Sequence, residues 1–138
     1  MAIILSRKDL EDSLKRLIKK PGIKYCSIVK MNGNLIDFEG EIRNMSLDTY
    51  SAMSATIYGA GKTANDHINT DEPHNIVIND GGGRTIIEGV GRSHIIVVRV
   101  GLDVELNKLI NEIEEETKFL SENWLRGHVI SSLKDKYG

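Results

Sequence analysis

Residues 75–100 contain three short runs rich in β-branched residues, separated by turns that contain glycine. The runs are NIVIN (75–79), RTIIEGV (84–90) and HIIVVRV (94–100), a pattern that predicts a meander of strands. Two more such runs, IKYCSIVKM (23–31) and LIDFE (35–39), flank Asn32-Gly33-Asn34. Because Asn-Gly between β-branched runs is a strong hairpin signal, these runs should also pair. The chain is therefore predicted to form one five-stranded antiparallel sheet.

Three amphipathic segments predict helices that flank this sheet. The first covers residues 6–20, with a capping pair at Ser6 and Asp9, and Pro21-Gly22 ends it. The second covers residues 47–68 behind the N-cap Ser46, and the third starts near Leu102 and ends at Leu120. The predicted order is α-β-β-α-β-β-β-α, an α+β fold. We expect one domain over residues 1–120 and a short C-terminal extension over residues 121–138.

Composition limits the classes of function. The 138 residues have a formal net charge of −2 with both signs interspersed, which gives no sign of nucleic-acid binding. No apolar run is long enough to span a membrane. Cys26 is the only cysteine, which excludes an internal disulfide and a cysteine-based zinc site. We therefore expect a cytoplasmic protein.

Residues 59–63, GAGKT, match the end of the phosphate-binding motif G-x-x-x-x-G-K-[ST]. The motif requires glycine at position 56, where the chain has Thr56. It also requires a loop between a strand and a helix, whereas these residues fall inside the predicted helix 47–68. We interpret the match as accidental, and a nucleotide hydrolase with a degenerate phosphate-binding loop is the least favoured alternative.

No catalytic, cofactor or metal site is predicted. The four histidines lie in different predicted elements without a second ligand at helical spacing, and no G-x-S-x-G motif occurs. The glutamates of the third helix are expected to face largely outward, and three arginines are assigned to strand edges and turns. These residues are Glu112, Glu114, Glu115 and Glu116, and Arg84, Arg92 and Arg99.

The predicted helix 47–68 is short of charge on both sides, because Lys62 is the only charged residue between Asp48 and Asp66. The face expected to lie on the sheet contains Leu47, Tyr50, Met53, Ile57, Gly61, Ala64 and Ile68. The opposite face contains the small residues Ser51, Ala52, Ala55, Thr56, Gly59 and Thr63. A helix with so little charge is predicted to be buried on both sides, with a second copy of the chain covering the small face.

The element order, the Asn32-Gly33 turn, the Gly- and Ala-rich middle helix and the segment IIVVRVGLDVELNKLINEI together resemble the Roadblock family. This family includes dynein light chains and prokaryotic regulators of small GTPases, and the resemblance covers about residues 6–120. It implies two-fold dimers in which the middle helices pair and the two sheets join through their third strands, here NIVIND. The expected dimer interface comprises Ala52, Ala55, Thr56, Gly59, Thr63, Ile76 and Ile78.

The function expected from this resemblance is a non-enzymatic homodimeric scaffold or regulator that binds a small Ras-like GTPase. Lys62 and Trp124 are the candidate docking residues for that partner. The alternative is a module that senses a small molecule held between helix and sheet.

Overall fold

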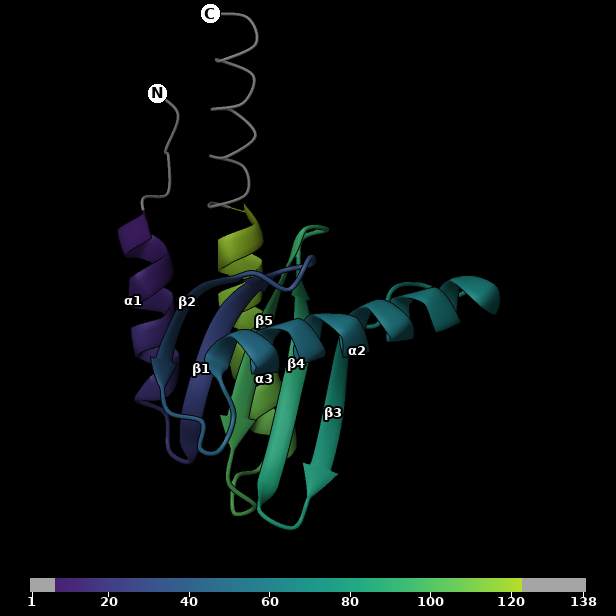
Figure 1. Cartoon of the computed structure of the whole chain (residues 1–138). Helices are drawn as coiled ribbons and strands as arrows, with labels where there is room; N and C mark the ends of the chain where they lie inside the picture. The colour runs from purple at the N-terminus through teal and green to yellow at the C-terminus, as the bar shows by residue number, and fades with distance from the viewer. Residues whose placement is uncertain (1–6, 123–138) are drawn as a thin grey trace, which may run out of the picture.

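The computed structural model describes residues 7–122, and they form a five-stranded antiparallel sheet with the strand order β2-β1-β5-β4-β3. Helix α2 crosses one face of the sheet, and α1 and α3 cover the other face (Figure 1). The predicted fold and element order are confirmed. The elements are α1 (Arg7–Ile18), β1 (Ile23–Lys30), β2 (Leu35–Gly40), α2 (Leu47–His67), β3 (Asn75–Asp80), β4 (Gly83–Val90), β5 (His94–Val100) and α3 (Leu106–Leu120).

The sheet separates two apolar cores because successive side chains of a strand point to opposite faces. In β5, the central strand, Ile96 and Val98 pack into the larger core under α1 and α3, whereas Ile95 and Val97 pack into the smaller core under α2. Arg99 is the one residue of β5 that is not fully buried. The smaller core leaves part of the α2 side of the sheet uncovered.

The β1–β2 hairpin forms at the predicted Asn-Gly turn. The Asn32 side chain accepts a hydrogen bond from the Asn34 backbone N–H at 3.0 Å, and Gly33 adopts φ 95°, which favours glycine. A Cβ atom on Gly33 would also lie 3.1 Å from the Cα of Ala52. The hairpin therefore lies directly against the first half of α2.

The predicted helix starts are confirmed for α2 and corrected for α3. The Ser46 hydroxyl accepts a hydrogen bond from the Thr49 N–H at 3.1 Å, as expected of an N-cap. Helix α3 begins at Leu106, and Leu102, which was expected to face the core, is 49% exposed. The segment between β5 and α3 is kept out of the helix by other hydrogen bonds: Gly101 N–H donates to Gly22 O at 3.0 Å, and Arg84 donates to Val104 O at 3.0 Å.

Helices α1 and α3 are joined by charged side chains. Arg16 binds Glu116 at 2.9 Å, the Ser13 hydroxyl also donates to Glu116, and Lys20 lies 3.4 Å from Glu112. Burial opposes ionisation of Glu116, but the hydrogen bonds from Arg16 and Ser13 outweigh it and lower its pKa. The expectation that Glu116 faces outward is therefore wrong, because its carboxylate pairs between the two helices.

Candidate protein-interaction site

The side of α2 that lies on the sheet differs from the predicted one. The buried residues are Ser51, Ser54, Ala55 and Tyr58, whereas Met53, Ile57 and Ile68, which were expected inside, are 52%, 37% and 71% exposed. The bulky side chains of this core come mainly from the strands, so small helix residues allow α2 to approach them.

Tyr58 is the large side chain by which α2 is fixed to the sheet. Its hydroxyl donates to Pro73 O at 3.0 Å, and a Cβ atom on Gly89 of β4 would lie 2.5 Å from that hydroxyl. Gly89 therefore leaves room for the Tyr58 ring on the sheet. This contact rotates α2 away from the orientation that the apolar periodicity predicted.

The rotation changes which residues are available to a second copy. Ala55, expected at the dimer interface, is buried in the core of its own chain, so that assignment is corrected. Ala52, Thr56 and Thr63 are exposed, and Gly59 is half-buried with open space where a Cβ would project. We define the outer face of α2 as the exposed, uncharged set Ala52, Met53, Thr56, Ile57, Ala60, Thr63 and Ala64.

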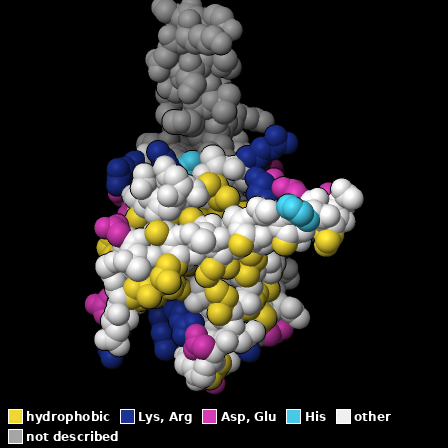
Figure 2. All heavy atoms as spheres, turned by 45° about the vertical axis from the view of Figure 1, so that its right-hand side comes forward, with side chains coloured by type: hydrophobic (Ala, Val, Ile, Leu, Met, Phe, Trp, Pro, Cys, Tyr) yellow, Lys and Arg dark blue, Asp and Glu magenta, His cyan; other side chains and the backbone are white. Residues whose placement is uncertain are grey.

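Strand β3 lies at one edge of the sheet and, among residues 7–122, pairs only with β4. Ile76 is half-buried and Ile78 is exposed on the same side as α2. The C-terminal half of α2 continues past this edge (Figure 1). Hydrophobic side chains gather along α2 and over the uncovered sheet below it (Figure 2). The outer face of α2 and the β3 edge thus form one continuous apolar surface.

Lys62, a candidate docking residue, is paired within the chain. Its Nζ lies 3.1 Å from Glu72, a residue of the connection between α2 and β3. Asn65 donates to Asp71 O in the same connection at 2.8 Å. The predicted location of GAGKT inside a helix is confirmed, so these residues lack the loop that would present free N–H groups to a phosphate.

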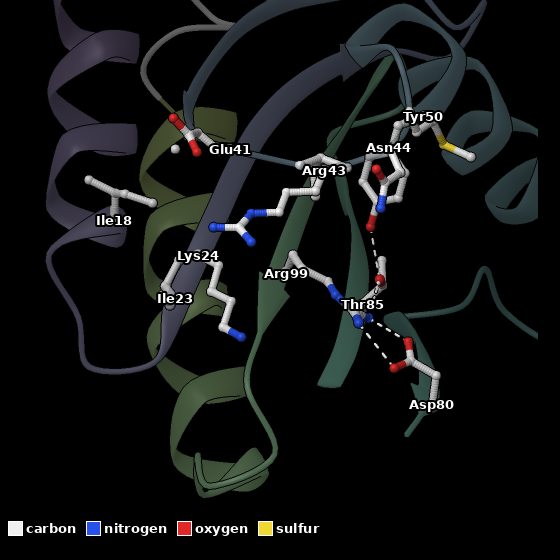
Figure 3. A pocket seen from close by; sticks show the side chains of 13 residues that line it. Ile18, Ile23, Lys24, Glu41, Arg43, Asn44, Tyr50, Asp80, Thr85 and Arg99 are labelled. Atoms are coloured by element: carbon white, nitrogen blue, oxygen red, sulfur yellow. Dashed lines mark hydrogen bonds and ion pairs between the residues drawn. The ribbon is translucent and has the colours of Figure 1, made fainter. Parts of the chain in front are cut away.

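A hollow of about 1060 Å³ lies beside the N-terminal half of α2 (Figure 3). Arg99 binds Asp80 through two contacts of 2.7 and 3.0 Å and donates to Thr85, whose hydroxyl is 2.8 Å from that of Tyr50. The Arg99 guanidinium lowers the pKa of Asp80 to about 2. Arg99 was expected at a strand edge or turn, whereas it lies in the central strand β5 and forms this network. Its place within the apolar run HIIVVRV was a signal for such a role.

The remaining predictions concern the C-terminal extension, metal binding and membrane spans. Trp124 and most of the predicted C-terminal extension lie outside the described residues. Within residues 7–122, no three His, Cys, Asp or Glu side chains are grouped closely enough to hold a metal ion. No helix in that same range combines the length and apolarity needed to cross a membrane.

A five-stranded antiparallel sheet with one long helix on one face and two on the other defines the Roadblock class of α+β domains. The Roadblock/LC7 domain model matches residues 9–99, and the chain belongs to this family. No curated protein matches the sequence.

Several solved structures have the same fold. Myxococcus xanthus MglB is 21% identical with a TM-score of 0.75, covering 80% of this chain and 90% of that chain. A Roadblock/LC7 domain from Streptomyces avermitilis is 17% identical with a TM-score of 0.74, covering 81% and 94%. An MglB structure described as having a tetrameric arrangement is 13% identical with a TM-score of 0.77, covering 91% and 96%. At these identities the likeness establishes the shared fold.

Proposed function

We propose that this protein is a non-enzymatic homodimeric regulator that binds a small Ras-like GTPase. The observation that carries the proposal is the continuous apolar surface formed by the outer face of α2 and the β3 edge. Exposed strand edges and uncharged helix faces of this extent are usually protected in monomers. Membership of the Roadblock/LC7 family and the tetrameric arrangement of a similar structure support self-association.

The dimer would form by pairing β3 with β3 of a second copy around a two-fold axis. Helix α2 lies close to β3 at Gly61, where a Cβ atom would lie 2.8 Å from Cδ1 of Ile76. The six residues from Lys62 to His67 continue beyond that point. At 1.5 Å per residue they extend about 9 Å, nearly two strand spacings, which would place them over the second sheet. The exposed Ile78 of each copy would then be covered.

The GTPase proposal is tested by immobilising the dimer and passing over it an extract of the native organism, loaded with either GDP or a non-hydrolysable GTP analogue. We expect a small GTPase to be retained in one nucleotide state. Its GTP hydrolysis should then be measured with and without the dimer, which separates an activator from a scaffold. Retention of no GTPase in either nucleotide state would contradict the proposal.

Lys62 offers a prediction that separates stability from docking. Because Lys62 and Glu72 are both partly exposed, breaking their ion pair by Lys62→Ala should change the unfolding free energy by less than about 1 kcal/mol. If the lysine also contacts the GTPase, Lys62→Ala should weaken partner binding, and Lys62→Glu should weaken it further. Thermal unfolding and titration calorimetry measure the two effects.

The matched control for Lys62 is Glu72→Gln, which breaks the same ion pair but keeps the cation. It should leave partner affinity unchanged or raise it. Equal losses of affinity in Lys62→Ala and Glu72→Gln would assign the effect to the shape of the α2–β3 connection and would remove Lys62 from the docking surface.

The second candidate function, small-molecule sensing, is favoured by the hollow shown in Figure 3. Lys24 and Arg43 line it alongside the Arg99 network, which would suit an anionic ligand. Native mass spectrometry of the purified protein tests this alternative. A bound small molecule that is lost in Arg43→Ala would support sensing over scaffolding.

A further inference from the structure

A second pocket, of about 600 Å³, lies between the α2–β3 connection, the end of β4 and α3. We call it the acidic pocket. Four of its lining residues carry carboxyl groups, and one more is a histidine. The residues that line it are Tyr58, Asp71, Glu72, Pro73, His74, Glu88, Gly89, Gly91, Glu114 and Thr117.

The acidic pocket is lined by a buried carboxyl group, one oxygen of which lacks a hydrogen-bond partner. Glu88 is 4% exposed, and its Oε2 atom has no hydrogen-bond partner in the described structure. Buried polar atoms are nearly always satisfied, and Glu88 is also a lining residue of the pocket, so its unpaired oxygen indicates a missing partner. Glu72 is already paired with Lys62, which leaves Asp71 and Glu114 as the other two carboxyl groups of the pocket.

The positions of the carboxyl groups in the acidic pocket favour one class of cation over another. The acidic side chains are spread around the pocket, and no three metal-ligating groups within residues 7–122 converge on one point. A single metal ion therefore does not fit. An alkylguanidinium group carries five N–H donors on a planar fork and can reach carboxylates that lie apart.

We infer that the acidic pocket binds an organic cation of the alkylguanidinium class, with an N–H group donating to the Glu88 carboxylate. Glu114 and Asp71 supply further negative charge, and Tyr58 and Pro73 form an apolar wall. This inference is independent of the proposed GTPase partner.

Binding should be coupled to release of a proton. Burial raises the pKa of Glu88 to about 8, the charge of Glu114 adds to the rise, and the Thr117 hydroxyl opposes it. The other titratable groups around Glu88 are Asp71, Glu72, His74 and Tyr58 in the pocket, and His94 on the same face of β5. At pH 7 the empty site is mostly protonated, and a cation must displace that proton to bind the carboxylate.

The test is a titration of the full chain with ethylguanidinium chloride, in which binding is measured by amide chemical shifts and by calorimetry. Affinity should rise about tenfold per pH unit from pH 6 to pH 7 and level off above about pH 8. Tetramethylammonium, which has charge but no N–H donor, should bind at least about tenfold more weakly. Similar affinities for the two cations, or an affinity independent of pH, would overturn the inference.

Variants localise the site. Glu88→Gln should weaken ethylguanidinium binding about tenfold or more and abolish its pH dependence, since the carboxylate is replaced by a neutral amide. Glu115→Gln, on the exposed side of α3, is the matched control and should bind as the wild type does. Unchanged binding in a folded Glu88→Gln variant would overturn the assignment.

Discussion

Replacing Ile57 by glutamate is expected to convert the proposed dimer into folded monomers. Ile57 is 37% exposed in the single chain, so the new carboxylate reaches water there and should change monomer stability little. In a dimer sealed by the outer face of α2, the same carboxylate would be buried without a partner, once from each copy. Such burial costs roughly 3 kcal/mol or more, about 100-fold or more in the dimer Kd.

Analytical ultracentrifugation over a concentration series measures this change. Leu102→Glu is the matched control, because Leu102 is a comparably exposed apolar residue that follows β5, away from α2. It should remain dimeric. Gly59→Glu should act like Ile57→Glu, since a side chain at Gly59 meets nothing within 4 Å in the single chain. A wild-type chain that is monomeric at roughly tens of micromolar, an ordinary range for dimer affinities, would contradict the proposed interface.

Glu88→Gln should stabilise the fold at neutral pH by about 3 kcal/mol. The Glu88 carboxyl has its pKa raised from an ordinary 4.5 to about 8 by burial and by Glu114. At pH 7 it is mostly protonated in the folded chain but ionised in the unfolded chain, so the wild type must take up a proton to fold. Glutamine resembles the protonated acid in shape and carries no such cost.

The stability difference between Glu88→Gln and the wild type should depend on pH. A raised carboxyl pKa leaves stability unaffected below the unfolded value of 4.5, lowers it progressively between 4.5 and about 8, and lowers it no further above that. Glu88→Gln and wild type should therefore unfold at the same urea concentration near pH 4 and diverge by pH 8. The exposed Glu115→Gln should show no such divergence, and equal midpoints for Glu88→Gln and wild type at both pH values would place the Glu88 carboxyl in water.

The strands and turns could be predicted because their signals are local. β-Branched runs and Asn32-Gly33 specified the strands and the hairpin to within about one residue, and Ser46 specified the start of α2. The prediction that Leu102 belongs to the third helix was wrong because Leu102 continues the apolar period of α3. A backbone hydrogen bond between Gly101 and Gly22 keeps that segment out of the helix. That bond joins residues far apart in the chain, and no local pattern reports it.

The candidate interaction site was predicted only in outline. The lack of charge on α2 is a property of the sequence, and the exposed outer face of this helix in the structure is uncharged. The outer face itself was misassigned, since Met53 and Ile57 continue an apolar period that was interpreted as the buried side. Ala55, a small residue expected outside, is buried instead because it fits against bulky strand side chains.

By itself the sequence determined the element order, the hairpin, the helix cap and the shortage of charge on α2, because each depends on residues close together in the chain. Only the tertiary structure decided which side of α2 meets the sheet, that Lys62 pairs with Glu72, and that Glu88 lies in an acidic pocket with Glu114. Glu88 stands in the run RTIIEGV, where a lone carboxylate suggests a solvent-facing position. Its burial results from the placement of α3 over β4, a contact between segments that the sequence does not place side by side.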